Sequence, residues 1–127
     1  MDQYHKPQTK KVRRGTGGSR GKYSDKRLAQ IGGVFTATRV AKEDRREKQR
    51  VRGGTSRIRL KRAAFASVRT KEGKMVKTRI LGVVGGPNPE YVRGNIIVKG
   101  TLLNTEAGKV KVTNRVGQDG VVNAVAV

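Results

Sequence analysis

Residues 50 to 61 read RVRGGTSRIRLK, and this stretch indicates how the chain folds. Two strand-like runs flank Gly53-Gly54, and a glycine pair supplies the positive φ angles that a tight hairpin turn requires. In the second run, Thr55 through Lys61, Ile58 and Leu60 fall on one face of a strand and the basic residues fall on the other. The stretch therefore predicts a hairpin whose second strand is half-buried and has a cationic outer face.

The residues after this hairpin alternate short β-rich runs with turns that contain Gly, Pro, Asn or Asp. The runs are Phe65–Arg69, Met75–Val84, Asn95–Lys99, Thr101–Thr105, Lys109–Thr113 and Val121–Val127. Many short strands with closely spaced turns predict a barrel or sandwich. We expect a mainly β fold, a small antiparallel β-barrel spanning residues 34–127, with a core built mostly of Val, Ile and Leu.

The residues before the hairpin are less regular. Val34–Val40 is rich in β-branched and aromatic residues and suits a short strand. Ala41–Arg50 is ambiguous, because its composition favours a helix and Asp44 precedes Lys48 by four residues. It has no apolar stripe to dock, however, so an isolated helix there would be marginal.

The N-terminal region, residues 1–33, differs from the rest in being basic and rich in glycine. Its stretch 5–33 contains six glycines, and eight Lys or Arg lie between Lys10 and Arg27 with no acid before Asp25. Neither a helical nor a strand period is visible, and glycine makes ordering costly in entropy. The pattern predicts an extended arm that becomes ordered on its partner.

The charge of the chain indicates what that partner is. Lys and Arg number 30 against 9 Asp and Glu, a formal net charge of +21. Residues 1–62 carry +15 of this excess (20 minus 5) and residues 63–127 carry +6 (10 minus 4). A small soluble protein tolerates such self-repulsion when a polyanion neutralises it. A membrane surface favours a basic amphipathic helix with aromatic anchors, which residues 5–27 do not provide, so we expect nucleic acid and no membrane.

The sequence also argues against an enzyme. His5 is the only histidine and cysteine is absent, which removes thiol nucleophiles and thiolate zinc sites. The acids within residues 43–47 lie among Lys and Arg that would neutralise them, whereas a catalytic acid needs a desolvated pocket. Residues 15–22 fail the phosphate-loop pattern, because Thr16 stands where its first Gly is required and Tyr23 follows the Lys. We expect no catalytic or metal site, no cofactor and no small-molecule substrate.

The basic positions are instead candidate contacts with nucleic acid. In the arm, small residues let backbone N–H groups and neighbouring cations approach phosphates closely. In the hairpin, the cations would form a second surface. The candidate contacts are Lys10, Lys11, Arg13, Arg14, Gly17, Gly18, Arg20, Lys22, Lys26, Arg27, Arg50, Arg52, Arg57, Arg59 and Lys61.

Several stretches together resemble one known family. They are Arg13-Arg14-Gly15-Thr16-Gly17-Gly18, the hairpin segments 50–54 and 57–60, and the tail segments 91–100, 105–109 and 117–125. These stretches resemble the archaeal and eukaryotic small-subunit ribosomal protein eight, a family distinct from the universal protein with the same number. The resemblance covers essentially the whole chain, and the tail and the short length are similar to the archaeal form.

The resemblance implies a β-barrel docked on small-subunit ribosomal RNA beside other small-subunit proteins, in the cytoplasm. It also implies that the basic arm runs between RNA helices as a structural constituent of the subunit. The charge alone leaves a rival open, a free DNA-compacting protein that binds duplex DNA without preference. Co-sedimentation with washed small subunits distinguishes the first from chromatin association of the second.

Overall fold

The structure is a computed structural model that describes residues 3–4, 12–18, 31–51 and 53–127. The contacts divide the chain into two units, Met1–Phe35 and Thr36–Val127. In the first unit, β1 (Gln3–Tyr4) pairs antiparallel with β2 (Ile31–Gly32). Most of the expected arm lies outside the described residues, so both its extended form and its boundary at residue 33 stay predictions.

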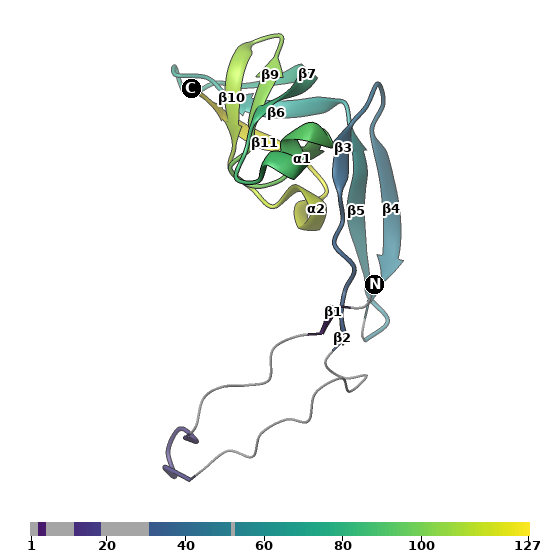
Figure 1. Ribbon diagram of the computed structural model, residues 1–127, viewed down its shortest axis with the longest axis vertical. Coiled ribbons are helices and arrows are strands. Elements are labelled where there is room, and N and C mark those ends of the chain that lie inside the picture. The colour runs from purple at the N-terminus through teal and green to yellow at the C-terminus, as the bar shows by residue number, and fades with distance from the viewer. Residues whose placement is uncertain (1–2, 5–11, 19–30, 52) are drawn as a thin grey trace. The chain divides into compact units, whose positions relative to one another are not determined.

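Five strands of the second unit close into a barrel (Figure 1). They are β6 (Phe65–Arg69), β7 (Met75–Gly85), β9 (Leu102–Thr105), β10 (Gly108–Val112) and β11 (Asn123–Ala126). Each strand pairs antiparallel with the next one in this series. An odd number of strands that alternate in direction cannot close antiparallel throughout, so β11 returns parallel to β6. The predicted small β-barrel is confirmed, with this one parallel pair.

The core of the barrel is small and aliphatic, as expected from the composition. Alternate residues of each strand point inward, because side chains on a strand alternate between its two faces. On β6, for example, Ala66 and Val68 are buried while Phe65 and Arg69 are exposed. The core contains Leu60, Ala63, Ala66, Val68, Ile80, Ile97, Leu103, Val110, Val112, Val116, Val122 and Ala124.

A second sheet has the order β4-β5-β3-β8. Its strands are β4 (Arg45–Arg50), β5 (Ser56–Ala63), β3 (Thr38–Val40) and β8 (Ile96–Ile97). The predicted hairpin is β4–β5, and its turn holds Gly53 at φ 85° and Gly54 at φ 79°. The Val51 N–H donates to the Thr55 carbonyl over 2.9 Å and closes that turn.

Two expectations for the region before the hairpin need correction. The helix-favouring composition of Ala41–Arg50 was misleading, because residues 45–50 form β4. A helix there would have no apolar face to bury, whereas the edge of β5 offers a ladder of backbone partners along the whole strand. Only Thr38–Val40 of the strand expected over Val34–Val40 is formed.

Two short helices were not expected. In α1 (Pro89–Arg93), the Asn88 side chain accepts a hydrogen bond from the Glu90 N–H over 3.0 Å and caps the first turn. In α2 (Val116–Asp119), the chain leaves the helix at Gly120 with φ 75°, a left-handed conformation that favours glycine. Within the described residues, no helix is long and apolar enough to cross a membrane.

Candidate nucleic-acid interface

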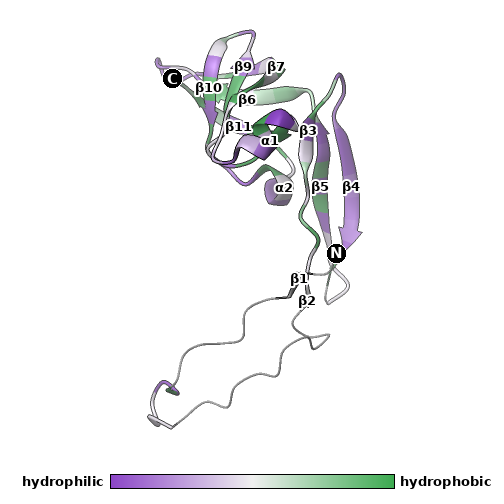
Figure 2. Ribbon diagram, viewed as in Figure 1, coloured by the Kyte–Doolittle hydropathy of each residue, from purple (hydrophilic) through white to green (hydrophobic). Residues whose placement is uncertain are grey.

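The strands β4 and β5 form a two-stranded ribbon that extends past α2, away from the barrel (Figure 1). We call these two strands the ribbon. Each contains four Lys or Arg, and Glu47 is the one acid in the pair. Every residue of β4 is exposed, and Figure 2 shows β4 as hydrophilic along its length. The ribbon therefore presents eight cations and one anion to solvent.

Both faces of the ribbon are cationic. Residues directly opposite each other on antiparallel strands share a face. The register Lys48↔Ile58 and Arg50↔Ser56 therefore places these two cations of β4 on the face of Ile58. The register Gln49↔Arg57 and Glu47↔Arg59 defines the other face. Phosphates can thus be contacted from either side of the ribbon.

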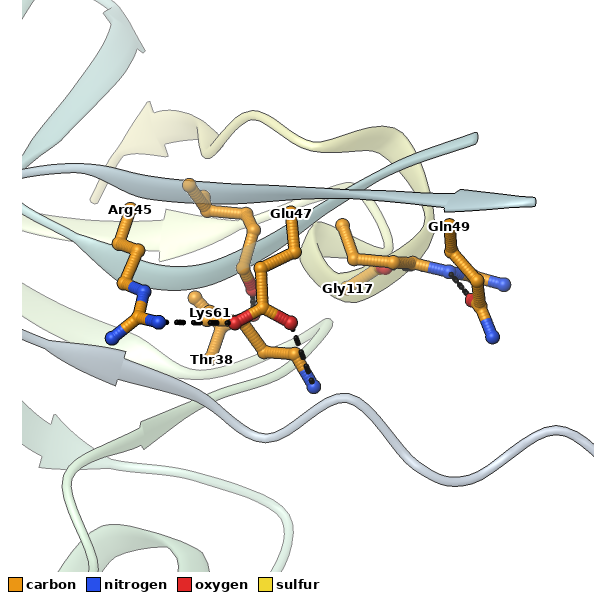
Figure 3. Close-up of polar contacts among 8 residues, drawn as sticks. Thr38, Arg45, Glu47, Gln49, Lys61 and Gly117 are labelled. Carbon is orange, nitrogen blue, oxygen red and sulfur yellow. Dashed lines mark hydrogen bonds and ion pairs between the residues drawn. The ribbon is translucent and has the colours of Figure 1, made fainter. Parts of the chain in front are cut away.

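The single acid is used within the ribbon. Glu47 lies between Arg45 and Lys61 (Figure 3), with nitrogen–oxygen distances of 3.6 Å and 3.9 Å. These pairs are solvent-exposed and contribute little to stability. Their effect is on the charge: one negative group against eight positive ones leaves an excess of seven.

Two arginines attach the ribbon to the loop around α2. Arg46 Nε donates to the Gly120 carbonyl over 3.2 Å, and Arg59 Nη1 donates to the Gly117 carbonyl over 3.3 Å. Arg59 Nε also donates to Gln49 Oε1 over 3.0 Å (Figure 3). These two guanidinium groups therefore position the ribbon, and Arg59 has fewer donors left for a ligand than an unbonded arginine.

The sequence-predicted hairpin residues lie together on the ribbon. Arg50 and Arg57 are exposed, while Arg59 and Lys61 are partly buried. The expected apolar face is confirmed at Leu60, which is 1% exposed, but Ile58 is 55% exposed. Ile58 lies beyond the part of β5 that the core covers. Arg52 lies outside the described residues.

The candidate arm residues that the structure describes form an exposed turn over residues 13–18. The Arg13 N–H donates to the Gly18 carbonyl over 2.8 Å, and the Gly17 N–H donates to the Arg13 carbonyl over 3.2 Å. The turn leaves the Arg13 and Arg14 side chains exposed. The other arm candidates, Lys10, Lys11, Arg20, Lys22, Lys26 and Arg27, lie outside the described residues.

Sequence reasoning missed the cations of β4 other than Arg50, namely Arg45, Arg46 and Lys48. The signal that could have found them is the hairpin itself. Counting the register back from the Gly53-Gly54 turn places residues 45–50 opposite residues 56–62. The cations of residues 45–50 then belong to a strand that pairs with β5, rather than to a segment with no partner.

The described residues contain no group of three or more His, Cys, Asp or Glu placed to hold a metal ion. Two of the acids within residues 43–47, Asp44 and Glu47, have different partners. Asp44 accepts from the Ala64 N–H over 2.7 Å and from Arg46 over 2.9 Å, whereas Glu47 pairs across the ribbon. They do not converge on a shared site.

Comparison with known proteins shows which family the chain belongs to. The family model of ribosomal protein S8e matches residues 7–127. The small ribosomal subunit protein eS8 of Staphylothermus marinus is 48% identical over 116 residues, covering 90% of this chain and 91% of that protein. The proteins of the same name from Sulfolobus acidocaldarius and Hyperthermus butylicus are 44% and 49% identical, covering 98% and 100% of this chain and 96% and 93% of theirs. The chain belongs to the ribosomal protein S8e family.

Proposed function

We propose that this protein is a structural, non-enzymatic constituent of the small ribosomal subunit in the cytoplasm, where it binds and stabilises the ribosomal RNA beside neighbouring proteins of the subunit. The observation that carries the proposal is the ribbon, with eight cations against one acid. The names of the relatives, small ribosomal subunit proteins, support the choice of partner.

The mechanism is neutralisation of phosphates from a rigid support. Double-stranded RNA is recognised mainly through its shape and backbone, which suits a ribbon whose cations are spaced by the strand repeat on both faces. A β-ladder fixes the backbone of the ribbon, so its Lys and Arg side chains lose only their own freedom on binding. The exposed pair Arg13 and Arg14 supplies a second group of phosphate contacts from the arm.

The test is the salt dependence of binding to small-subunit ribosomal RNA by the full chain. Each phosphate contact contributes about 0.9 to the slope of log affinity against log salt on duplex DNA, a guide for RNA. The variant Lys48→Ala, Arg50→Ala, Arg57→Ala should flatten the slope by about two to three units. The variant Arg13→Ala, Arg14→Ala should flatten it by about one to two.

The matched control removes two cations from the turn between β6 and β7, with Lys71→Ala and Lys74→Ala, and should change the slope less than the arm variant does. An unchanged slope in both the ribbon and the arm variants would contradict the mechanism. Absence of the protein from salt-washed small subunits, together with equal affinity for duplex DNA, would instead support the DNA-compacting alternative.

A further inference from the structure

The outer wall of the barrel carries an aromatic ring beside two cations, outside the ribbon and the arm. Phe65, the first residue of β6, is 38% exposed although phenylalanine is one of the residue types that are most often buried. The Lys77 Nζ lies 4.6 Å from the centre of its ring, and the Arg79 Cζ lies 5.9 Å from it. Both distances are within the range of cation–π contacts.

The strand register gathers these groups on one surface. Phe65 lies directly opposite Arg79, and the next outward pair along the strands is Ser67 opposite Lys77. The residues between them, including Ala66 and Thr78, are buried in the barrel. The strands β6 and β7 contain Arg69, Lys77 and Arg79 and no acid, so the charged residues of these two strands are all basic.

Main-chain and side-chain contacts surround Arg79 on this wall. Arg79 Nη2 donates to the Lys42 carbonyl over 3.3 Å, which holds the guanidinium in place. Asp44, close in the chain to Lys42, is already engaged by the Ala64 N–H and by Arg46. Glu106 approaches through its backbone N–H, which donates to the Arg79 carbonyl over 3.2 Å.

An exposed aromatic ring on a basic β-surface is the arrangement on which proteins stack the bases of single-stranded RNA. We infer that Phe65 stacks an unpaired base of RNA, while Lys77 and Arg79 contact the phosphates of the same strand. This inference rests on the proposed function, and it adds a site for single-stranded RNA to the phosphate contacts of the ribbon and the arm.

The relative strengths of the contacts allow a base to replace the Lys77 ammonium group on the ring of Phe65. An exposed cation–π contact such as that of Lys77 with Phe65 is worth a factor of about two to five in an equilibrium constant. Stacking of a base on an aromatic side chain is worth about five- to 150-fold. A base therefore displaces the ammonium group from the ring, and the flexible lysine remains close enough to contact the phosphate of that nucleotide.

The first experiment compares Phe65→Leu with Phe65→Tyr in the full chain. The probes are a single-stranded oligouridylate about 8 nucleotides long and an RNA duplex. Phe65→Leu should weaken binding of the oligouridylate about five- to 150-fold by the same factor at every salt concentration, because stacking is not an ionic contact. Phe65→Tyr should retain the affinity, and binding of the duplex should be unchanged in both variants.

The phosphate contact of Lys77 should change the salt dependence of binding, which the stacking contact does not. Lys77→Ala should flatten the slope of log affinity against log salt for the oligouridylate by about 0.7, the contribution of one phosphate on a single strand. Thermal unfolding of each variant checks that a loss of binding is not a loss of fold. Loss in Phe65→Leu with Phe65→Tyr folded but equally weak would overturn the inference, because tyrosine offers the same stacking face.

A second experiment does not depend on affinity. The chain contains no tryptophan, so Phe65→Trp introduces a single emitter at the site. Oligouridylate should quench its fluorescence, whereas a control emitter at the start of β9, Leu102→Trp, opposite Gly85 at the far end of β7, should be quenched much less.

The outcomes separate this inference from the proposed function. Equal quenching at positions 65 and 102, or unchanged single-strand binding in Phe65→Leu, overturns the stacking site and leaves the ribbon and the arm untouched. Binding of a small-subunit protein, rather than RNA, to the surface around Phe65 would also overturn the stacking site. Failure of the full chain to bind small-subunit ribosomal RNA overturns the proposed function itself.

Discussion

The barrel and the ribbon are both built from paired β-strands, yet they differ in how much of each strand is buried. The barrel strands bury one face in a shared aliphatic core, which contains residues of all five strands. In the ribbon, β4 buries none of its side chains and β5 buries Leu60 and Ala63. The ribbon is held by the backbone ladder, by the base of β5 in the core and by two arginines, rather than by a core of its own.

This difference separates stability from binding. A strand whose side chains are all exposed can carry a high density of charge, because its cations remain hydrated. Edge strands with charged side chains also resist pairing with other chains, and β4 is one of the two edge strands of its sheet. The comparison predicts that substitutions in the barrel change the free energy of unfolding, whereas substitutions at the tip of the ribbon change affinity for RNA.

The largest expected effect comes from the barrel core. Leu103 on β9 is 0% exposed, so Leu103→Ala should lower the free energy of unfolding by about 2–5 kcal/mol through lost burial and a residual cavity. Leu81→Ala is the matched control, because Leu81 is 59% exposed on β7, and it should stay within about 0.5 kcal/mol. Urea unfolding followed by circular dichroism measures both. Equal losses would mean that the barrel core does not dominate stability.

A smaller effect tests how α2, which the ribbon contacts, packs against the segment before β3. A Cβ added at Gly117 would lie 3.0 Å from the Thr36 carbonyl oxygen and 3.1 Å from the Thr36 Cβ. The backbone of Thr36 would have to shift, so Gly117→Ala should destabilise the protein by about 1–3 kcal/mol. Gly82→Ala meets nothing within 4 Å and should stabilise by about 0.5–1 kcal/mol. Urea unfolding measures both variants, and a neutral Gly117→Ala would show that α2 packs loosely against Thr36.

The barrel strands could be predicted from the sequence because each carries its own signal. The run predicted over residues 65–69 coincides with β6, and the run predicted over 75–84 falls one residue short of β7. Alternation of apolar and polar residues reports directly on a strand with one buried face. The resemblance stated from the tail segments is likewise confirmed by the match to the S8e family.

The ribbon was predicted only in part, because pairing rather than pattern makes it a strand. The sequence of β4, RREKQR, contains no apolar residue, so its periodicity carries no information. The exposure of Ile58 depends on how far the core reaches along β5, which no local pattern reports. The helices α1 and α2 are five and four residues long, too short to show a helical period.

The smallest effect distinguishes two neighbouring arginines of the ribbon. Arg59 donates to Gln49 and to the Gly117 carbonyl, whereas the side chain of Arg57 makes no hydrogen bond or ion pair to the described residues. Arg59→Ala should therefore lower the free energy of unfolding by about 0.5–1.5 kcal/mol, and Arg57→Ala should leave it unchanged. In salt titrations with ribosomal RNA, Arg57→Ala should flatten the slope at least as much as Arg59→Ala. A reversed order in the two measurements would contradict the division of labour, because an arginine bonded within the protein would then be the stronger phosphate contact.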